Sequence, residues 1–502
     1  MLKAIEHRGR DDEGVWVSSA ITDDGQRVCL GHRRLSIIDT SSAGHEPMVS
    51  ADGRLVITYN GEIYNYRELR QELVGKGHVF RTQTDTEVLL AAWSEWGEES
   101  LARLNGMFAF ALWDASHRAL FLVRDHVGIK PLYYAQCQRP EGHPAFLFAS
   151  EVKAILASQL LKAELDHQSL HQFLTFLWVL DPNTLFREIK TVQPGHLVEW
   201  RDGEVKTRQW WDVSFADIDE GRSESWWQER LLETLDRVVK LEMIADVPLG
   251  SFLSGGIDSS SIVTMMKHHS NGRRIETYTI GMDAADLRYD IIPDDVEWAR
   301  KVNQQLDTAY HEIILKPDVA ELLPKLVYHM DEPAIDMAIP SYLVSQAARE
   351  TLRVMLSGMG GDEVFAGYPR QMAMKIAGAF DPVPQLLRRP VMRAIEYALP
   401  GGLPGKLTAP LRNAKKFARS AALDFENRYL GYQTYFTDEA KQRLYADDLR
   451  AETRDADAYV AHRRYFQAAK DAAPLNQLLY VDMKTFLPCL NLITTDKTSM
   501  AA

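Results

Sequence analysis

The chain has 502 residues and a formal net charge of −13, and 46% of its residues are hydrophobic and 25% charged, as in ordinary globular proteins. This length predicts two to four domains, and the acidic excess disfavours general binding to nucleic acid or anionic membranes, although a local basic patch is compatible with it. The apolar runs are too short to span a membrane, and the start has no signal pattern of a secreted protein. The three cysteines form no disulfide framework, and the 15 scattered histidines argue against a zinc site. These features favour a cytoplasmic protein.

The first 200 residues predict mainly strands with turns. Residues 54–66 alternate between apolar and polar and break at Asn60-Gly61, which is a typical hairpin-turn signal. A second hairpin is predicted around "DASHR" at 114–118, and helical periodicity covers 67–75 and 86–96. We therefore expect a mixed domain with antiparallel strands and helices.

The polar, acidic stretch 212–225 predicts a linker. After it, apolar residues recur at helical spacing, which predicts a helix with one buried face; they are Trp227, Leu231, Leu235 and Val238. From about residue 245, predicted strands and helices alternate, which favours a parallel, doubly wound sheet. The remainder, 371–502, is mostly helical in pattern.

The loop "LSGGIDSSS" at 253–261 joins a predicted strand to a predicted helix. Its glycines allow close backbone approach, and free N–H groups at the helix start, together with the serine hydroxyls, can bind phosphate. No lysine follows as in a Walker A loop, which favours a pyrophosphate that departs as a unit. Asp258 suits a Mg²⁺ ligand, whereas the alternative is a serine-rich turn that caps itself.

A second loop, "LSGMGGDEVFAGY" at 356–368, also follows an apolar strand. Loops at the carboxyl ends of parallel strands meet at one edge of the sheet. Asp258 and Asp362 could therefore hold one Mg²⁺ on a bound triphosphate. Taken alone, the second loop could equally be a solvated acidic turn.

These loops carry a resemblance to a known family. The first resembles the PP-loop of ATP pyrophosphatases, and both, with "DEPAIDMAIPSY" (331–342), resemble the synthetase domain of the glutamine-dependent asparagine synthetase family. Motifs of the first half resemble the class-II glutaminase domain of that family; they are "HRGRDDEG" (7–14), "LGHRRLSIIDTSSAGHEPM" (30–48), "YNGEIYNYRELR" (59–70), "TDTEV" (84–88), "LNGMFAFALWD" (104–114) and "RDHVGIKPLYY" (124–134). The resemblance spans nearly the whole chain.

The resemblance implies an α/β protein of two domains. Residues 1–211 would form an Ntn-hydrolase αββα sandwich, with two antiparallel sheets between helices, and 226–502 a PP-loop ATP pyrophosphatase domain with a parallel sheet and a helical C-terminal part. The first would hydrolyse glutamine, and ammonia would pass through an apolar tunnel to the second. There, ATP and Mg²⁺ would activate a carboxylate as an acyl-adenylate, and ammonia would displace AMP to give an amide.

The same resemblance implies roles for individual residues. Arg34 would pair with the glutamine carboxylate, Ile37 and Ile38 would give backbone contacts, Asn60 and Gly61 would form the oxyanion hole, and Glu62 and Asp85 would hold the amino end. The ATP-binding residues would be Phe252, Ser254, Gly255, Gly256, Asp258, Ser259, Ser260, Ile280, Ser357 and Gly358. Asp258 and Asp362 would be the metal ligands.

The resemblance breaks at the nucleophile. The family uses an N-terminal cysteine, which is absent here, and Cys29 is expected to be a small buried residue in mid-strand. We therefore expect the natural protein to extend beyond both ends of the chain, with a further catalytic lysine after residue 502. Arg10 and Glu46 stand where the family usually has proline and glutamine.

The acceptor is open at this stage. Met359 stands where the family commonly has an acid that can take the proton of ammonia, and a thioether cannot do so, which leaves Glu363 or Glu332 as other bases. Aspartate is the first candidate acceptor, and a uronic acid or a β-lactam-type ring closure is the alternative. A non-catalytic regulator that binds glutamine and nucleotide is a third hypothesis. The expected partners are small molecules, not nucleic acid or membrane, and a homodimer is one assembly open to the chain.

Overall fold

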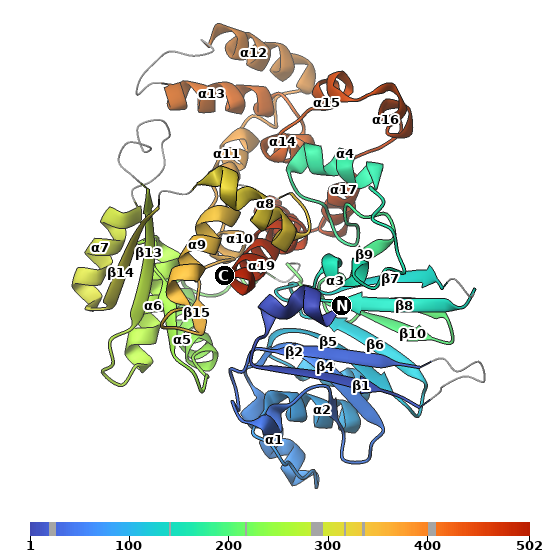
Figure 1. Ribbon diagram of the computed structural model, residues 1–502. Helices are drawn as coiled ribbons and strands as arrows, with labels where there is room; N and C mark the ends of the chain where they lie inside the picture. Colours follow the sequence, from blue (N-terminus) through green and yellow to red (C-terminus); the bar gives the residue numbers. More distant parts are fainter. Residues whose placement is uncertain are drawn as a thin grey trace.

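The computed structural model describes residues 1–19, 27–139, 142–215, 218–282, 295–315, 318–333, 337–399 and 408–502. Two parts that contain β-sheets lie side by side, with helix α19 (Ile493–Ala501) between them and further helices above (Figure 1). Residues 216–217 of the predicted linker and 334–336 of the "DEPAIDMAIPSY" segment lie outside the described residues. None of the described helices is both long and apolar enough to cross a bilayer.

The first part is a sandwich of antiparallel sheets. A six-stranded sheet has the order β11-β10-β6-β5-β4-β3, and a second layer consists of the pair β1-β2 and the sheet β8-β7-β9. The strands are β1 (Asp12–Val17), β2 (Cys29–Arg34), β3 (Met48–Val49), β4 (Leu55–Ile63), β5 (Gly106–Asp114), β6 (Ala119–Arg124), β7 (Tyr133–Gln138), β8 (Pro144–Ala149), β9 (Ile189–Thr191), β10 (His196–Arg201) and β11 (Glu204–Gln209). The helices are η1 (Leu2–Arg8), η2 (Ser42–Gly44), α1 (Tyr66–Gly75), α2 (Asp85–Trp96), η3 (Gly97–Arg103), α3 (Val152–Leu156) and α4 (His167–Phe176).

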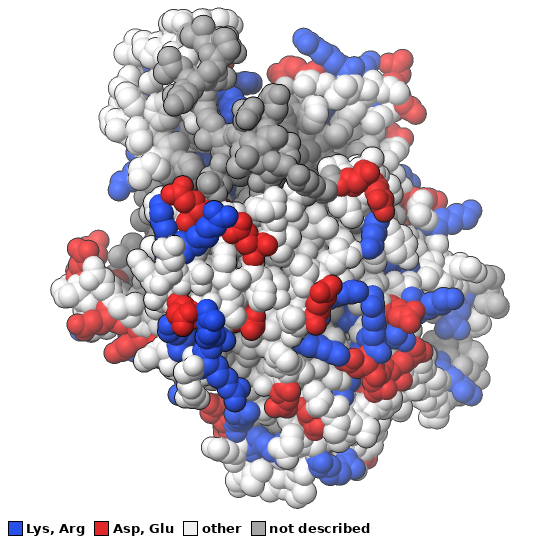
Figure 2. Space-filling view, turned by 60° about the vertical axis from the view of Figure 1, so that its left-hand side comes forward, with Lys and Arg blue, Asp and Glu red and all other residues white. Residues whose placement is uncertain are grey.

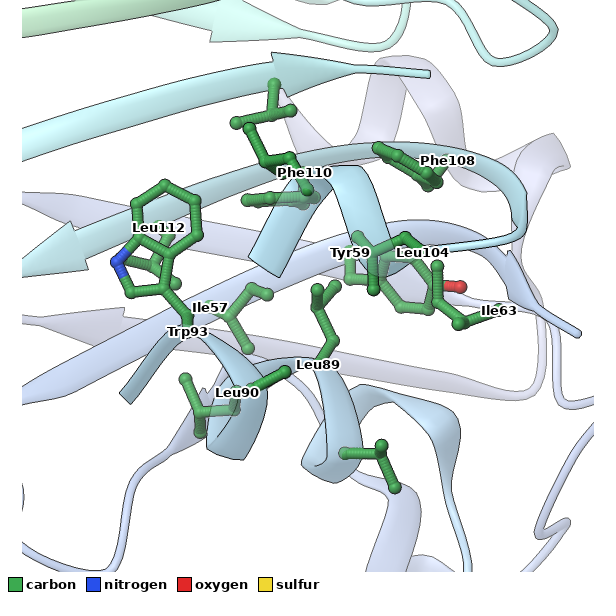
Figure 3. Packing of buried hydrophobic residues seen from close by; sticks show 14 of the residues in the cluster. Ile57, Tyr59, Ile63, Leu89, Leu90, Trp93, Leu104, Phe108, Phe110 and Leu112 are labelled. Atoms are coloured by element: carbon green, nitrogen blue, oxygen red, sulfur yellow. The ribbon is translucent and has the colours of Figure 1, made fainter. Parts of the chain in front are cut away.

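Alternation along the central strands builds two cores. Ile57 and Tyr59 of β4, and Phe110 of β5, face α1 and α2, as Figure 3 shows. Their neighbours Val56 and Ala111 face the second sheet layer. Because successive side chains of a strand point to opposite faces, one sheet buries both surfaces. The predicted sandwich of helix, two sheets and helix is confirmed, with α3 and η1 against the outer side of the second layer.

The prediction of a hairpin turn at Asn60-Gly61 is wrong. Both residues lie inside β4, where Asn60 pairs with Ala109 and Gly61 with Phe108. A Cβ atom at Gly61 would lie 2.1 Å from the Met107 carbonyl oxygen, so glycine lets the two strands approach. Asn-Gly here serves a close strand contact instead of a turn. The hairpin around 114–118 and the two helices are confirmed as β5-β6, α1 and α2.

The second part contains a parallel sheet of order β14-β13-β12-β15, as predicted. Its strands are β12 (Leu249–Phe252), β13 (Glu276–Met282), β14 (Ala309–Leu315) and β15 (Val354–Leu356), and β14 was not predicted from the sequence. The helices around it are α5 (Glu224–Glu242), α6 (Ile257–His269), α7 (Asp295–Leu306), α8 (Val319–Met330), α9 (Ala338–Ala348) and α10 (Gly361–Phe365).

The remaining residues form the predicted helical region. Its helices are α11 (Pro369–Gly378), α12 (Gln385–Ala398), α13 (Thr408–Ala421), α14 (Phe425–Gln433), α15 (Asp438–Leu444), α16 (Asp447–Glu452), α17 (Val460–Ala468), α18 (Pro474–Lys484) and the π-helical segment η5 (Leu487–Leu492). Their main core surrounds Tyr429, Phe466 and Val481. Figure 2 shows acidic and basic side chains interspersed over the lower half of one face, so that half carries no field of a single sign.

The predicted buried face of α5 is exposed at Trp227 and Leu231 and half-buried at Leu235 and Val238. Trp227 is 46% and Leu231 40% exposed, and Val239 near the end of the helix is the residue that is buried. Helical spacing correctly predicted the helix, but the neighbouring elements cover only its last turns. Asp236 fastens that end to α6 by accepting hydrogen bonds from His268 and His269, at 2.9 and 2.8 Å.

A buried network of charges joins α19 to the first part. Arg8 donates to Asp496 at 2.7 Å and to Glu151 at 3.0 Å, and Lys130 donates to Asp496 at 3.1 Å. The side chains of Arg8, Glu151 and Asp496 are almost completely buried. Since a buried charge is costly unless it is paired, each group requires its partners.

A second set of ion pairs continues this network into the other part. Asp331 accepts from Lys153 at 3.0 Å and from Lys497 at 2.8 Å, and Lys153 also contacts Glu151. Burial opposes ionisation of Glu151, but the bond from His7 and the charge of Arg8 hold its pKa well below the ordinary value. We call these seven residues the interface ion network; they are Arg8, Lys130, Glu151, Lys153, Asp331, Asp496 and Lys497.

We predict that Asp496→Asn lowers the free energy of unfolding by about 3–5 kcal/mol, because it leaves Lys130 without its charge partner and Arg8 with Glu151 alone. Urea titration followed by tryptophan fluorescence measures this change. Asp447→Asn, which removes the carboxylate of an exposed pair with Arg450, is the matched control and should change stability little. Equal effects of the two substitutions would contradict a stabilising role for the network.

Candidate active sites

The residues predicted to bind glutamine line one cavity of about 620 Å³ in the first part. Those residues are Arg34, Ile37, Ile38, Asn60, Gly61, Glu62 and Asp85. They come from the end of β2, the segment after it, the end of β4 and the start of α2. The fold therefore brings together every residue of this predicted set.

Arg34 is buried and positioned by backbone carbonyls. Its guanidinium donates to the carbonyl oxygens of Ser41 at 2.9 Å, Ile38 at 3.2 Å and Asp39 at 2.6 Å. Among the described residues no carboxylate lies within ion-pair distance of it. The side chain thus brings a fixed positive charge to the cavity without an acidic partner, which suits a carboxylate ligand.

Two polar atoms beside Arg34 lack partners. The side-chain amide nitrogen of Asn60 and Oε2 of Glu62 are buried and make no hydrogen bond to the described residues. A buried polar atom without a partner is costly and rare in folded proteins. Both residues line the cavity, so these atoms are ready to bind a polar ligand there.

Three of the residues that line this cavity are buried acids, namely Glu46, Glu62 and Asp85. Asp85 accepts hydrogen bonds from the Tyr59 hydroxyl at 2.8 Å and the Ile63 N–H at 2.9 Å, and burial nevertheless raises its pKa. Burial, followed by the charge of Asp85, raises the pKa of Glu62. Burial also raises the pKa of Glu46 to about 8, and Glu46 is an acid of this cavity to which the sequence assigned no role.

Cys29 does not match its predicted position. It is the first residue of β2 and is exposed, not a buried residue in mid-strand. Arg34 lies five residues further along the same strand, about 16 Å away at the usual rise per residue. Although Cys29 lines an outer part of the same large cavity, it is far from the Arg34 end.

In the second part, the loop after β12 has the shape expected of an anion-binding turn. Gly255 has a positive φ of 77°, and a Cβ atom there would lie 2.4 Å from the Ala299 backbone nitrogen, so only glycine fits. The hydroxyls of Ser254 and Ser259 form a hydrogen bond of 3.0 Å with each other. Such a bond is expected of a serine-rich turn that caps itself, which was the alternative interpretation of this loop. The buried hydroxyl of Ser260, by contrast, has no partner among the described residues.

Asp258 and Asp362 come together from neighbouring parallel strands. The second loop packs so closely on Asp258 that a Cβ atom at Gly361 would lie 2.6 Å from its carboxyl carbon. Burial and then the negative charge of Asp362 raise the pKa of Asp258. Within the described part of the chain, neither carboxylate has a hydrogen-bond donor or a cationic partner. Two neighbouring carboxylates without such a partner fit a divalent cation with oxygen ligands.

The other predicted nucleotide residues lie on the strands and loops next to this pair in the chain. Phe252 and Ile280 are half-buried on the adjacent strands β12 and β13, and Gly256 caps α6. Ser357 accepts a hydrogen bond from the Met359 N–H at 3.1 Å, and Gly358 would place a Cβ atom 2.8 Å from Asp258. The two loops therefore form one site at the carboxyl edge of the parallel sheet.

The two alternative bases are engaged with the protein. Glu363 accepts hydrogen bonds from the Tyr368 hydroxyl at 2.8 Å and the Asn491 amide at 2.6 Å, and Glu332 accepts from the Leu185 N–H at 2.8 Å. Burial raises the pKa of both carboxyl groups. Oε2 of Glu363 has no partner among the described residues, whereas Met359 is 41% exposed and offers no base.

We predict that Glu46→Gln stabilises the protein at neutral and higher pH. Between about pH 4.5 and 8 the folded state holds a proton on Glu46 that the unfolded chain has lost, so stability falls as the pH rises through this window. Without this proton, glutamine can accept from the Tyr59 N–H with its carbonyl oxygen and donate to the Thr86 hydroxyl with its amide nitrogen.

The variant should therefore match wild type near pH 4.5 and exceed it at about pH 8 by on the order of a few kcal/mol in urea titrations. Glu68→Gln on the exposed surface of α1 is the control. A pH-independent difference between Glu46→Gln and wild type would rule out a buried, protonated Glu46.

Comparison with known proteins matches the two parts of the chain to two kinds of domain. A family model described as a glutamine amidotransferase domain matches residues 1–211, and one described as asparagine synthase matches residues 230–502. Glutamine-hydrolyzing asparagine synthetase 1 of Bacillus subtilis is 32% identical over 504 residues, which cover 100% of this chain and 74% of the relative. Asparagine synthetase B of Escherichia coli is 31% identical over 386 residues, which cover 73% of this chain and 60% of the relative.

Among solved structures, the glutamine phosphoribosylpyrophosphate amidotransferase of B. subtilis with ADP and GMP matches with a TM-score of 0.31 and 16% identity, covering 64% of this chain and 78% of that one. The family assignment comes from the matches along the sequence. The asparagine synthase model covers more than half of the chain, and the full-length match to the B. subtilis relative exceeds 30% identity. This chain therefore belongs to the asparagine synthase family.

Proposed function

We propose that the chain is a ligase that converts aspartate to asparagine, using ATP and the amide nitrogen of glutamine. The proposal rests on the close approach of Asp258 and Asp362 at the carboxyl edge of the parallel sheet. The same chain contains the cavity that Arg34 and the other predicted glutamine-binding residues line. The named activity of the relatives supports it. The two domains proposed are 1–211 and 226–502, with 212–225 as the linker.

In the first domain, the described residues would bind and orient glutamine. Arg34 supplies the positive charge for the α-carboxylate, and the buried acids Glu62 and Asp85 attract the α-ammonium group. The Asn60 side-chain amide nitrogen, which has no partner in the described structure, would donate to the oxyanion that develops on the carbonyl oxygen of the glutamine side chain. Gly61 follows it in the strand and completes the expected oxyanion hole.

In the second domain, the two loops would bind ATP with its phosphates toward α6. The unpaired Ser260 hydroxyl and the backbone N–H groups at the start of α6 would donate to phosphate oxygens. Asp258 and Asp362 would hold Mg²⁺, which neutralises the charge of the triphosphate. A carboxylate is a poor electrophile, so transfer of the AMP group of ATP to a carboxylate oxygen, with release of pyrophosphate, prepares the acyl carbon for attack by ammonia and departure of AMP.

We predict that Asp258→Asn and Asp362→Asn each lower pyrophosphate release by at least about a hundredfold, with aspartate and free ammonia as substrates. Each substitution removes one of the two charges that would hold the metal while leaving side-chain size unchanged. A coupled assay for pyrophosphate measures the rate, and thermal unfolding checks that the variants are folded.

Asp471→Asn, in the exposed turn between α17 and α18, is the control and should leave the rate unchanged. If either variant at the paired site keeps more than half of the wild-type rate, the metal assignment is wrong.

We further predict that Met359→Glu accelerates asparagine formation from aspartate and ammonia by about tenfold or more, since it adds a base beside the Asp258–Asp362 pair. Met359→Gln has the same size without the base and should give no gain. Product formation is followed by amino-acid analysis at saturating ammonia. Faster pyrophosphate release with a uronic acid than with aspartate would overturn the proposed acceptor, and equal rates for the Glu and Gln variants would overturn the role of position 359.

A further inference from the structure

A pair of helices far from both sites presents an unusual surface. Helices α12 and α13 pack on each other at the top of the molecule, away from both sheets (Figure 1). Together they contain seven basic residues and one acidic residue, although the whole chain has a formal charge of −13. The charge of this pair is therefore opposite to that of the protein as a whole.

Helix α12 also exposes large apolar side chains. The exposed fractions are 88% for Leu386, 64% for Leu387, 57% for Val391, 43% for Ile395 and 87% for Tyr397. Single exposed leucines are common, but five large apolar side chains on a helix of 14 residues indicate an interaction surface. At the level of α12 in Figure 1, the left side of Figure 2 is mostly white, with few charged side chains.

The exposed side chains form one face of the helix. At 100° per residue, Leu387, Val391 and Ile395 fall within an arc of about 80°, and Leu386 and Tyr397 extend it on the side of Leu387 to about 180°. The buried Met392 lies outside this arc, against α13, and Arg388 anchors that side of α12 through an ion pair with Asp381 at 2.6 Å. The apolar face is thus held outward by packing on the other side of the helix.

Cations border this apolar face and cover part of α13. Arg393 and Arg389 are exposed and lie about 20° and 60° beyond Leu386, outside that end of the 180° arc. On α13 the basic residues share an arc of about 100°, opposite the side that packs; they are Arg412, Lys415, Lys416 and Arg419. Apolar side chains flanked by arginine and lysine are the pattern of a helix that lies in the headgroup region of a bilayer.

We propose that the outer face of α12, with the basic side of α13, binds the surface of an anionic lipid membrane. Leucine, valine and isoleucine would enter the boundary of the acyl chains, and the cations would contact anionic headgroups. A second copy of the chain fits this surface less well, because it would bring two equally basic surfaces together. Nucleic acid fits less well because aliphatic side chains do not stack on bases.

The test uses the 502-residue chain and two kinds of vesicle. In co-sedimentation at low salt, the chain should bind phosphatidylglycerol-containing vesicles at least about fivefold more than pure phosphatidylcholine vesicles, and high salt should reduce this difference. The double variant Leu387→Glu and Val391→Glu should lose the binding. Arg389→Gln with Arg393→Gln should weaken binding to the anionic vesicles only.

The chain offers a matched control. Leu444 and Val460 are 63% and 62% exposed on α15 and α17, so Leu444→Glu with Val460→Glu introduces the same charges at equally exposed sites elsewhere. This control should bind vesicles like wild type, and all variants should keep the wild-type rate of ammonia-dependent pyrophosphate release in buffer. That readout separates a failure of this proposal from a failure of the proposed ligase activity.

Four outcomes would overturn the proposal. The first is no preference for anionic vesicles. The second is equal loss of binding in the control variant. The third is a dimer in sedimentation velocity that the Leu387 and Val391 substitutions dissociate, without any binding to vesicles, which would assign the surface to a second copy. Retained vesicle binding in the Leu387 and Val391 variant would likewise exclude this face as the membrane contact.

Discussion

The pairing of buried charges between α19 and the first domain is the constraint on which the arrangement of the two sites depends. Arg8, Glu151 and Asp496 have little access to water, so each is tolerated only while its partners stay within hydrogen-bond distance. Apolar packing would tolerate small shifts between the domains, whereas directional ion pairs do not. The network therefore fixes one orientation of α19 against the sandwich.

This helix contacts the surroundings of both sites through neighbouring residues. Asp496 pairs with Lys130, and both Lys130 and Met500 line the cavity of the residues predicted to bind glutamine. Lys497, the next residue, pairs with Asp331 in the segment that the sequence assigned to the synthetase site. Successive residues of a helix point about 100° apart, so one turn of α19 can reach toward both domains at once.

Much of the fold and of the sites could be predicted from the sequence. The β-rich runs on both sides of 114–118 predicted β5 and β6, helical spacing predicted α1 and α2, and the two glycine-rich loops predicted that Asp258 and Asp362 lie close together. The wrong predictions share one cause: the sequence pattern of a segment does not show which other elements pack against it. Asn60-Gly61 has the composition of a turn, but the close approach of β5 requires glycine inside the strand. The spacing of Trp227 and Leu231 predicts a helix, and no periodicity can tell whether another element covers it.

The long-range charge pairs could not be predicted, because single residues such as Arg8 and Asp496 have no pattern that links them. Their separation of 488 residues has a consequence for the order in which the protein forms. At typical rates of translation, Asp496 leaves the ribosome roughly half a minute to a minute and a half after Arg8. During that interval the sandwich can fold, but Arg8 lacks one of its two carboxylate partners and faces water. The Arg8–Asp496 pair can form only once synthesis has reached α19, so until then the nascent sandwich exposes an incomplete charged surface where α19 will bind.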